Sequence, residues 1–267
     1  MSFEHILFSI EAGVATLILN RPEQLNSFNA QMHGEVREAL KRVRQSKEAR
    51  VLLLTGEGRG FCAGQDLGDR NVAPGSAMPD LGESIEKFYN PMIRQLRDLP
   101  MPVICAVNGV AAGAGANIPL ACDLVLAARS ASFLQAFCKL GLVPDSGGTW
   151  TLPRLVGMAR AKALTLLGER LSAEQAVEWG LIYRCVDDAE LRDEALDLML
   201  GALSVDDPES VDAAPTKLQQ LRRQHEAEAY QNTLARDPTF RTPCASGAGA
   251  LARLDTYTLA AVACDDA

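Results

Sequence analysis

The chain has 267 residues, of which 48% are hydrophobic and 22% charged, and its formal net charge is −8 at pH 7. This composition is typical of a globular protein, and no run of about 20 uninterrupted apolar residues predicts a membrane-spanning helix. An acidic chain repels nucleic acid on average, so we expect neither a nucleic-acid partner nor a membrane partner.

Residues 1–5 lack the basic and long apolar segments of a secretory signal, so we expect a cytoplasmic protein. The seven cysteines form no C-x-x-C pair and lie mostly in apolar runs, which indicates reduced, buried thiols. Only three histidines occur, none of them near another histidine or a cysteine. We therefore expect no metal site and no Ser-His-Asp triad, and an enzyme of this sequence would use carboxylates and backbone groups.

Short apolar strands alternate with helical patterns along the first half of the chain. A strand is predicted over 14–19, a helix with Asn29 as its N-cap follows, and a second strand is predicted over 51–54. The order strand, helix, strand predicts a parallel sheet. The polar segment 65–79 is predicted to be a mobile loop.

Further elements are predicted by the same patterns. An apolar helical face runs through 85–96, and strands are predicted over 103–107, 124–127 and 131–133. A turn over 144–149 opens a helical region. The helices predicted there cover 158–167, 173–179 after the N-cap Ser172, and 189–203. After about residue 204 the pattern weakens.

Three constellations are candidates for chemistry. The glycine-rich segment 58–67 follows a strand and exposes N–H groups that can bind an anion or a developing oxyanion, although a plain tight turn has the same composition. The small-residue run 109–117 leads into a helix N-terminus, but it also fits close helix packing, and it lacks the last glycine of a dinucleotide-binding fingerprint.

The third candidate is Asp145. It follows Leu142 and Val143 and lies near Phe137 in sequence, so its carboxylate could sit in apolar surroundings that suit a general acid or base. Aspartate is equally a favoured turn and N-cap residue, and the residue types alone leave both interpretations open.

The order and spacing of several motifs resemble the crotonase (enoyl-CoA hydratase/isomerase) superfamily from about residue 5 to about residue 203. The motifs are Asn20-Arg21-Pro22, Phe61-Cys62-Ala63-Gly64-Gln65-Asp66-Leu67, Asn108 to Gly115, Gly147-Gly148-Thr149 and Ala173 to Leu181. The resemblance implies an α/β fold, a crotonase-type spiral of ββα units over 1–203. It also implies a helical C-terminal, oligomerisation region over 204–267, whose tail diverges from the family pattern.

The same resemblance implies an acyl-CoA thioester substrate, no cofactor beyond the coenzyme A of that substrate, and assembly as a trimer or hexamer. The backbone N–H groups of Gln65 and Ala114 would form the oxyanion hole. The residues that would contact coenzyme A or the acyl group are Arg21, Leu25, Ala63, Gly64, Asp66, Leu67, Gly113 and Phe137.

Hydratases of the family carry two glutamates, and the corresponding positions here are Asn117 and Phe137. Neither side chain transfers protons as a glutamate does, so water addition is not expected. The resemblance instead implies Asp145 as the catalytic acid and base, as in isomerase-like members, with Asn117 as a polar catalytic-site residue.

Segment 133–157 is most similar to a branch of the family that acts in phenylacetate degradation. That branch converts ring-1,2-epoxyphenylacetyl-CoA to oxepin-CoA and shifts 3-enoyl-CoA to 2-enoyl-CoA, as also happens in fatty acid metabolism. A general Δ3,Δ2-enoyl-CoA isomerase or a hydratase-like enzyme is the alternative. A thioester dehalogenase would need a histidine base, and none lies between His33 and His225. From another class, a non-catalytic member that binds acyl-CoA or RNA remains open.

Overall fold

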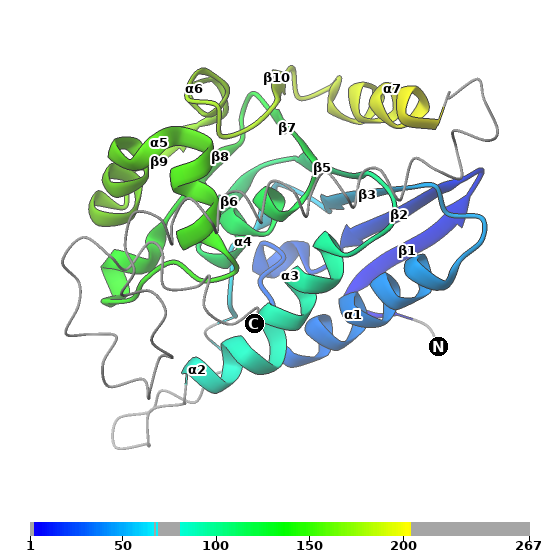
Figure 1. The fold of residues 1–267 in the computed structure, drawn as a ribbon, viewed down its shortest axis with the longest axis horizontal. Helices are drawn as coiled ribbons and strands as arrows, with labels where there is room; N and C mark the ends of the chain where they lie inside the picture. The colour runs from blue at the N-terminus through cyan, green and yellow to red at the C-terminus, as the bar shows by residue number, and fades with distance from the viewer. Residues whose placement is uncertain (1–2, 67, 69–80, 204–267) are drawn as a thin grey trace, which may run out of the picture.

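A computed structural model describes residues 3–66, 68 and 81–203 (Figure 1). The predicted C-terminal region 204–267, the predicted binding residue Leu67 and most of the predicted loop 65–79 lie outside the described residues. Within the part that the structure describes, no helix is both long and apolar enough to cross a membrane.

The larger of two sheets has six strands in the order β1-β2-β3-β5-β7-β10. Their bounds are Ile6–Glu11 for β1, Val14–Leu19 for β2, Val51–Gly56 for β3, Val103–Val107 for β5, Leu124–Ala128 for β7 and Arg184–Val186 for β10. β1 and β2 form an antiparallel hairpin, whereas every pairing from β2 to β10 is parallel. The predicted parallel sheet is confirmed. Every residue of β5 is buried, as in a strand covered on both faces.

Helices cover the two faces of this sheet (Figure 1). α1 (Ala30–Gln45) packs against β1, β2 and α3 (Asn90–Arg97), while α7 (Leu191–Leu203) lies over β3, β5 and β7. The predicted N-cap of α1 is confirmed, because the Asn29 side chain accepts a hydrogen bond from the Met32 amide at 2.9 Å. α2 (Leu81–Ser84) continues through a π-helical turn, Ile85–Tyr89, into α3.

The smaller sheet contains β4 (Gly60–Cys62), β6 (Val110–Ala112), β8 (Ser132–Leu134) and β9 (Arg170–Ser172) in that order. β4, β6 and β8 are parallel, and β9 is antiparallel to β8. Because parallel strands end at the same edge, the segments that follow β4, β6 and β8 meet there. These segments contain Gln65, Ala114 and Phe137.

Short helical turns lie between the strands, and further helices follow in the second half of the chain. The 3-10 turns are η1 (Pro22–Gln24), η3 (Pro119–Ala121) and η4 (Ala136–Leu140), and α4 is Ala114–Asn117. α5 (Gly148–Leu167) begins inside the predicted turn 144–149, ten residues before the helix predicted over 158–167, and is interrupted at Gly157, whose φ is 77°. α6 (Ala173–Glu178) begins after Ser172, whose side chain accepts from the Gln175 amide, as predicted for its N-cap.

The described cysteines agree only in part with the prediction of buried thiols. Cys62 and Cys105 are buried, whereas Cys122, Cys138 and Cys185 are partly exposed, and all five are free.

Candidate functional site

Two loops meet at Gly64, directly after β4. Gly64 has a φ of +87°, a conformation that residues with a Cβ rarely adopt. A Cβ at this position would lie 2.8 Å from the carbonyl oxygen of Ala112 and 3.4 Å from the amide nitrogen of Ala114. The first glycine-rich segment therefore lies directly against the start of α4, and the two predicted donor loops are neighbours.

The backbone at Gln65 is held by a parallel bridge to Phe28. The Phe28 amide donates to the Gly64 carbonyl at 2.7 Å, and the Asp66 amide donates to the Phe28 carbonyl at 2.9 Å. Successive amides of an extended segment point to opposite sides, so the Gln65 N–H points away from Phe28. It donates to no acceptor among the residues that the structure describes.

The Gln65 side chain is held in place separately from its backbone. Its Nε2 donates to the Phe28 carbonyl at 2.9 Å, and its Oε1 accepts from the Tyr89 hydroxyl at 3.1 Å. Tyr89 is the last residue of the π-helical turn. The side chain is thereby kept on the Phe28 side while the backbone N–H faces the other way.

Ala114 is the first residue of α4, so its N–H has no acceptor within the helix. No carbonyl of the described residues accepts it across the chain either. The preceding Gly113 has the non-helical angles φ 56° and ψ −129°, and its own N–H donates to the Leu134 carbonyl at 2.9 Å. The backbone thus presents the N–H of Ala114 beside the loop of Gly64 and Gln65.

The turn of Asp145 lies immediately before α5. The carboxylate accepts from the Ser146 hydroxyl at 3.0 Å, and the main-chain carbonyl accepts from the Gly148 amide at 2.9 Å. Ser146 is buried with a φ of +52°, so the turn holds a residue other than glycine in the left-handed region. Of the apolar residues near Asp145 in sequence, Leu142 and Val143 are 38% and 48% exposed, whereas Phe137 is 7% exposed.

Asn117, the last residue of α4, is 0% exposed. Its Nδ2 donates to the Asp145 carbonyl oxygen at 2.9 Å, and its Oδ1 accepts from the Gln135 side chain at 2.8 Å. The structure therefore brings Asn117 to Asp145, as the sequence predicted. It places the amide inside the protein, where both of its polar atoms are bonded, rather than on an open surface.

Phe137 is 7% exposed and lies over the other end of the α4 segment. The tip of its ring, Cζ, is 4.0 Å from the point where a Cβ on Gly113 would lie. An apolar ring therefore lies beside the N-terminus of α4. Neither Phe137 nor Asn117 offers an ionisable group beside the turn of Asp145.

Arg21, predicted to contact coenzyme A or the acyl group, bonds to other residues of the chain in this structure. The Arg21 guanidinium pairs with the Asp66 carboxylate at 2.9 Å and donates to the Ser27 carbonyl at 2.6 Å, and its side chain is 13% exposed. The Ala63 amide donates to the Leu25 carbonyl at 2.9 Å. These residues lie together, as predicted, but the charge of Arg21 is largely matched by Asp66.

Asn26 belongs to the site loop and was missed by the sequence analysis. It is 0% exposed, and its side chain donates to the carbonyls of Glu57 and Gly60 at 2.9 and 2.8 Å while accepting from the Arg21 amide at 2.8 Å. Its φ of +55° is a conformation in which asparagine is enriched, and this preference was the available signal. Asn26 fixes the loop of Arg21 to β4.

Cys62 lies at the end of β4, and its sulfur accepts a hydrogen bond from the Gly64 amide at 3.4 Å. Burial raises the pKa of the Cys62 thiol to about 12, so the thiol is neutral at physiological pH. The described part of the chain contains no group of three or more His, Cys, Asp or Glu side chains placed to hold a metal ion.

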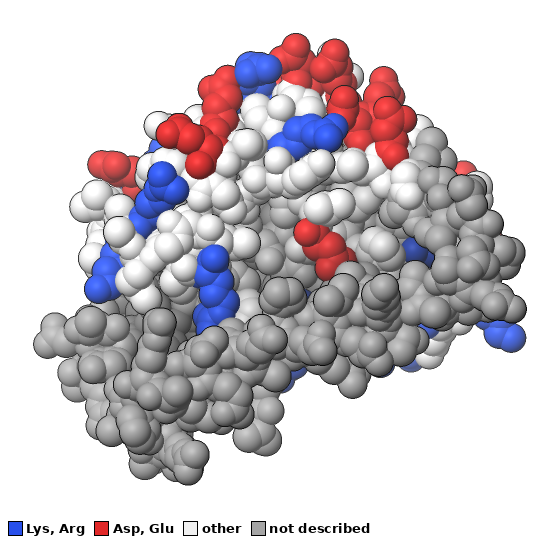
Figure 2. Space-filling view, turned by 45° about the horizontal axis from the view of Figure 1, so that its top comes forward, with Lys and Arg blue, Asp and Glu red and all other residues white. Residues whose placement is uncertain are grey.

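Charged side chains are unevenly distributed on the surface. Figure 2 shows acidic side chains gathered along the upper rim of one face, with a few basic side chains among them. An anionic ligand is repelled along such a rim. Backbone N–H groups such as those of Gln65 and Ala114 are donors that carry no counter-charge.

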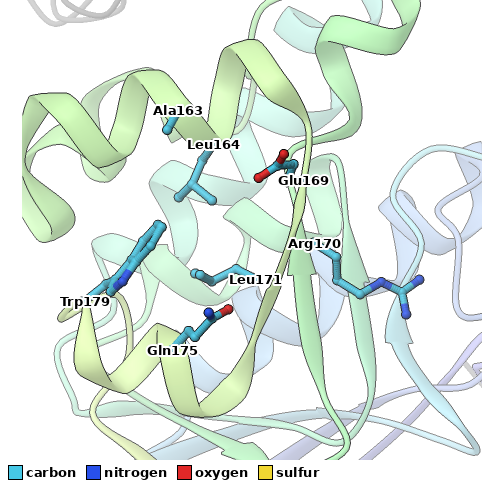
Figure 3. Close-up of a pocket in the computed structure, with 7 residues that line it drawn as sticks. All are labelled: Ala163, Leu164, Glu169, Arg170, Leu171, Gln175 and Trp179. Atoms are coloured by element: carbon cyan, nitrogen blue, oxygen red, sulfur yellow. The ribbon is translucent and has the colours of Figure 1, made fainter.

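A separate hollow of about 240 Å³ lies between α5, β9 and α6. Figure 3 shows Arg170 pointing away from Trp179 and Leu164, so its charge lies outside the hollow. The lining residues are Ala163, Leu164, Glu169, Arg170, Leu171, Gln175 and Trp179. No predicted site residue is among them.

Comparisons with known proteins identify the family of the chain. Residues 9–243 match the enoyl-CoA hydratase/isomerase family. The chain is 63% identical over 195 residues to a 1,2-epoxyphenylacetyl-CoA isomerase of Escherichia coli (strain K12), covering 73% of this chain and 74% of that protein. It is 49% identical over 190 residues to a probable enoyl-CoA hydratase of Rhodobacter capsulatus, covering 71% and 72%.

Solved structures confirm the fold. The crystal structure of an enoyl-CoA hydratase from Mycobacterium smegmatis superimposes with a TM-score of 0.76 at 28% identity, covering 90% of this chain and 92% of that one. The predicted crotonase-type α/β fold is therefore confirmed, and the chain belongs to the enoyl-CoA hydratase/isomerase family.

Proposed function

We propose that this chain is an acyl-CoA isomerase that converts ring-1,2-epoxyphenylacetyl-CoA to oxepin-CoA and shifts 3-enoyl-CoA to 2-enoyl-CoA. One observation carries the proposal: the carboxylate-bearing turn of Asp145 is bonded to α4, whose first amide lies beside the loop of Gln65. Positions 117 and 137 hold no ionisable side chain, which favours proton transfer by a single carboxylate. The Escherichia coli relative, an isomerase by name, supports the same reaction class.

In the proposed mechanism, the N–H groups of Gln65 and Ala114 donate to the thioester carbonyl oxygen. Negative charge gathers on that oxygen when the α-carbon loses a proton, and each such donor contributes about 3 kcal/mol to stabilising the transition state. The Asp145 carboxylate removes the α-proton of a 3-enoyl thioester, leaving a dienolate. The same carboxyl group then returns the proton to the γ-carbon, so the double bond moves to the 2,3 position and no atom is gained or lost.

The epoxide substrate fits the same proton transfer. The carbon–carbon bond shared by the epoxide and the six-membered ring opens to give a seven-membered oxepin ring. Asp145 takes the proton from the side-chain α-carbon and returns it to a ring carbon in the γ position, which places a double bond in conjugation with the thioester. The product is an isomer of the substrate, and the step needs no external reductant, oxidant or water.

The binding residues follow from the same proposal. Leu25, Ala63, Gly64 and Gly113 would line the acyl-CoA channel, together with the ion pair of Arg21 and Asp66 and with Leu67 and Phe137. Coenzyme A enters as part of the substrate and no further cofactor is proposed. We also place the protein in the cytoplasm as a trimer or hexamer, with no nucleic-acid or membrane partner.

The test is Asp145→Asn, which keeps the size of the side chain and removes the base. With 3-enoyl-CoA as substrate we expect kcat to fall by about a thousandfold or more, while binding of a saturated acyl-CoA is retained. Asp197→Asn, at an exposed position of α7, is the matched control and should retain full turnover. Near-normal turnover by Asp145→Asn would refute the assignment.

A hydratase is the second candidate, because the Rhodobacter capsulatus relative bears that name. Product analysis separates the two. A hydratase forms 3-hydroxyacyl-CoA from 2-enoyl-CoA, whereas the proposed isomerase interconverts 3-enoyl and 2-enoyl thioesters without taking up water. A general Δ3,Δ2-enoyl-CoA isomerase would act on the enoyl thioester and leave the epoxide unchanged. An acyl-CoA- or RNA-binding protein would turn over neither.

A further inference from the structure

Buried amide side chains link three separate segments of the chain. Gln135 follows β8 and donates from Nε2 to Oδ1 of Asn117 at 2.8 Å; Asn117 then donates from Nδ2 to the carbonyl of Asp145 at 2.9 Å. Gln135 and Asn117 are 3% and 0% exposed. Buried side-chain hydrogen bonds of this kind are protected from competition by water and fix the position of the groups they join.

The first residue of α5 is a glycine, Gly148, which leaves room for the Asn117 side chain. A Cβ at Gly148 would lie 2.4 Å from Nδ2 of Asn117, so a side chain there would collide with the amide. The Gly148 N–H donates to the same Asp145 carbonyl that Asn117 bonds. Two donors therefore converge on one carbonyl oxygen and hold the turn, including the left-handed Ser146.

Asn117 also connects the turn to the proposed oxyanion hole. It is the last residue of α4, and Ala114 is the first. A helix rises about 1.5 Å per residue, so the two residues lie within one rigid turn. Residues at the C-terminal end of β8 bond to both ends of α4. The Leu134 carbonyl accepts from the amide of Gly113, which precedes α4, and the Gln135 side chain donates to Asn117, its last residue.

We propose that Gln135 and Asn117 are positioning residues that fix the Asp145 carboxylate relative to the Ala114 N–H. The inference rests on the proposed function and deepens it, because it assigns Asn117 a role through Asp145 rather than in contact with the substrate. A shift of about 1 Å between the base and the oxyanion donors can lower the rate a hundredfold. Loss of the link, by which we mean the hydrogen bonds from Gln135 to Asn117 and from Asn117 to the Asp145 carbonyl, therefore lowers kcat. KM, which reflects binding along the acyl-CoA channel, changes little.

Asn117→Asp tests the link to Asp145 specifically. The new carboxylate still accepts from Gln135, but in its ionised form it has no donor for the Asp145 carbonyl. When it is protonated, its O–H donates there again, and burial raises the pKa of a carboxyl group so that this form is reached at mildly acidic pH. We expect kcat about tenfold or more below that of the unaltered chain at mildly alkaline pH, with KM within about threefold. The ratio of the two kcat values should rise towards 1 as the pH falls. A ratio independent of pH, or an effect on KM alone, overturns the inference.

Gln135→Met tests the other end of the link with a side chain of similar volume, and Gln95→Met, a half-buried glutamine of α3, is the matched control. Hydrogen exchange supplies a readout that does not depend on turnover. The Gly148 amide, which donates to the Asp145 carbonyl, should lose protection in Gln135→Met and keep it in Gln95→Met. If the unaltered chain shows no isomerase activity, the proposed function fails, while loss of protection still supports the link. Unchanged protection overturns the positioning role.

Discussion

Replacing Gly64 with alanine should destabilise the fold and slow the proposed reaction together. A left-handed φ costs an L-residue about 1–2 kcal/mol. The new methyl group would also meet the Ala112 carbonyl oxygen at 2.8 Å, a backbone atom that cannot rotate away. Overpacking of this kind adds about 1–3 kcal/mol, so we expect the free energy of unfolding to fall by about 2–5 kcal/mol, measured by urea denaturation.

The same contact predicts the size of the kinetic effect. Ordinary van der Waals contact begins at 3.4 Å, so the loop of Gly64 and the segment before α4 must separate by about 0.6 Å. That shift moves the Gln65 N–H away from the Ala114 N–H. Since a misplacement of about 1 Å can lower the rate a hundredfold, we expect kcat for 3-enoyl-CoA to fall by about tenfold.

Two matched variants separate conformational strain from the close contact. Gly141 has a φ of +68° with nothing within 4 Å of an added Cβ, so Gly141→Ala should lose only about 1–2 kcal/mol. Gly34 lies in α1 with equally open surroundings and an ordinary φ, so Gly34→Ala should gain up to about 1 kcal/mol. Equal stability of Gly64→Ala and Gly141→Ala would refute the reasoning from the Ala112 contact.

Two further predictions concern stability. Partial burial alone would raise the pKa of Glu35, but hydrogen bonds from the Gln31 side chain and from the backbone amides of residues 4–5 outweigh it and lower the pKa below its ordinary 4.5. The stability that Glu35 contributes is therefore complete above about pH 4.5 and lost as the pH falls through the lower folded value. Urea denaturation of Glu35→Gln should thus differ from the unaltered chain most near neutral pH, and a gap that widens on acidification would contradict this. Asn26→Ala removes three hydrogen bonds, from the Arg21 amide and to the carbonyls of Glu57 and Gly60, and should lower the free energy of unfolding by about 2–4 kcal/mol; a loss below about 1 kcal/mol would show that water replaces the amide.

Several of the longer elements, among them α1, α7, β2 and β5, were predicted from periodicity because burial shapes them, whereas β1 and residues 148–157 of α5 were not predicted. β5 is apolar throughout and central, and α1 repeats its buried positions at helical spacing after a capping asparagine. Of the five three-residue strands that the structure describes, only β8 was predicted, over 131–133; β4, β6, β9 and β10 were not, because strands of this length are too short to carry a clear period. Pairing with strands that are distant in sequence makes them strands, and such pairing is not visible in a local pattern.

The same distinction applies to the candidate site. The two glycine-containing segments that carry Gly64 and Gly113 could be identified from composition because positive φ angles favour glycine, and the resemblance to the family placed both glycines at the site. The roles of Asn26 and Asn117 could not be predicted, because each depends on carbonyl groups that the fold brings from elsewhere in the chain. Asn117 was placed at the site through family resemblance, and its bonds to Gln135 and Asp145 became visible only in three dimensions.

The three parallel strands of the smaller sheet also determine when the site can form during folding. β4 pairs Gly60 with Val110 of β6, and β6 pairs Val110 with Ser132 of β8, so each pairing closes a long loop. Contacts between residues distant in sequence form slowly, because the loop entropy is lost before the contacts are gained. Helices such as α1 form from local contacts, so we expect them to recover early in refolding. The amides of Gln65 and Ala114 come together only when this sheet closes, so we expect the return of catalytic activity during refolding to lag behind the return of helical structure.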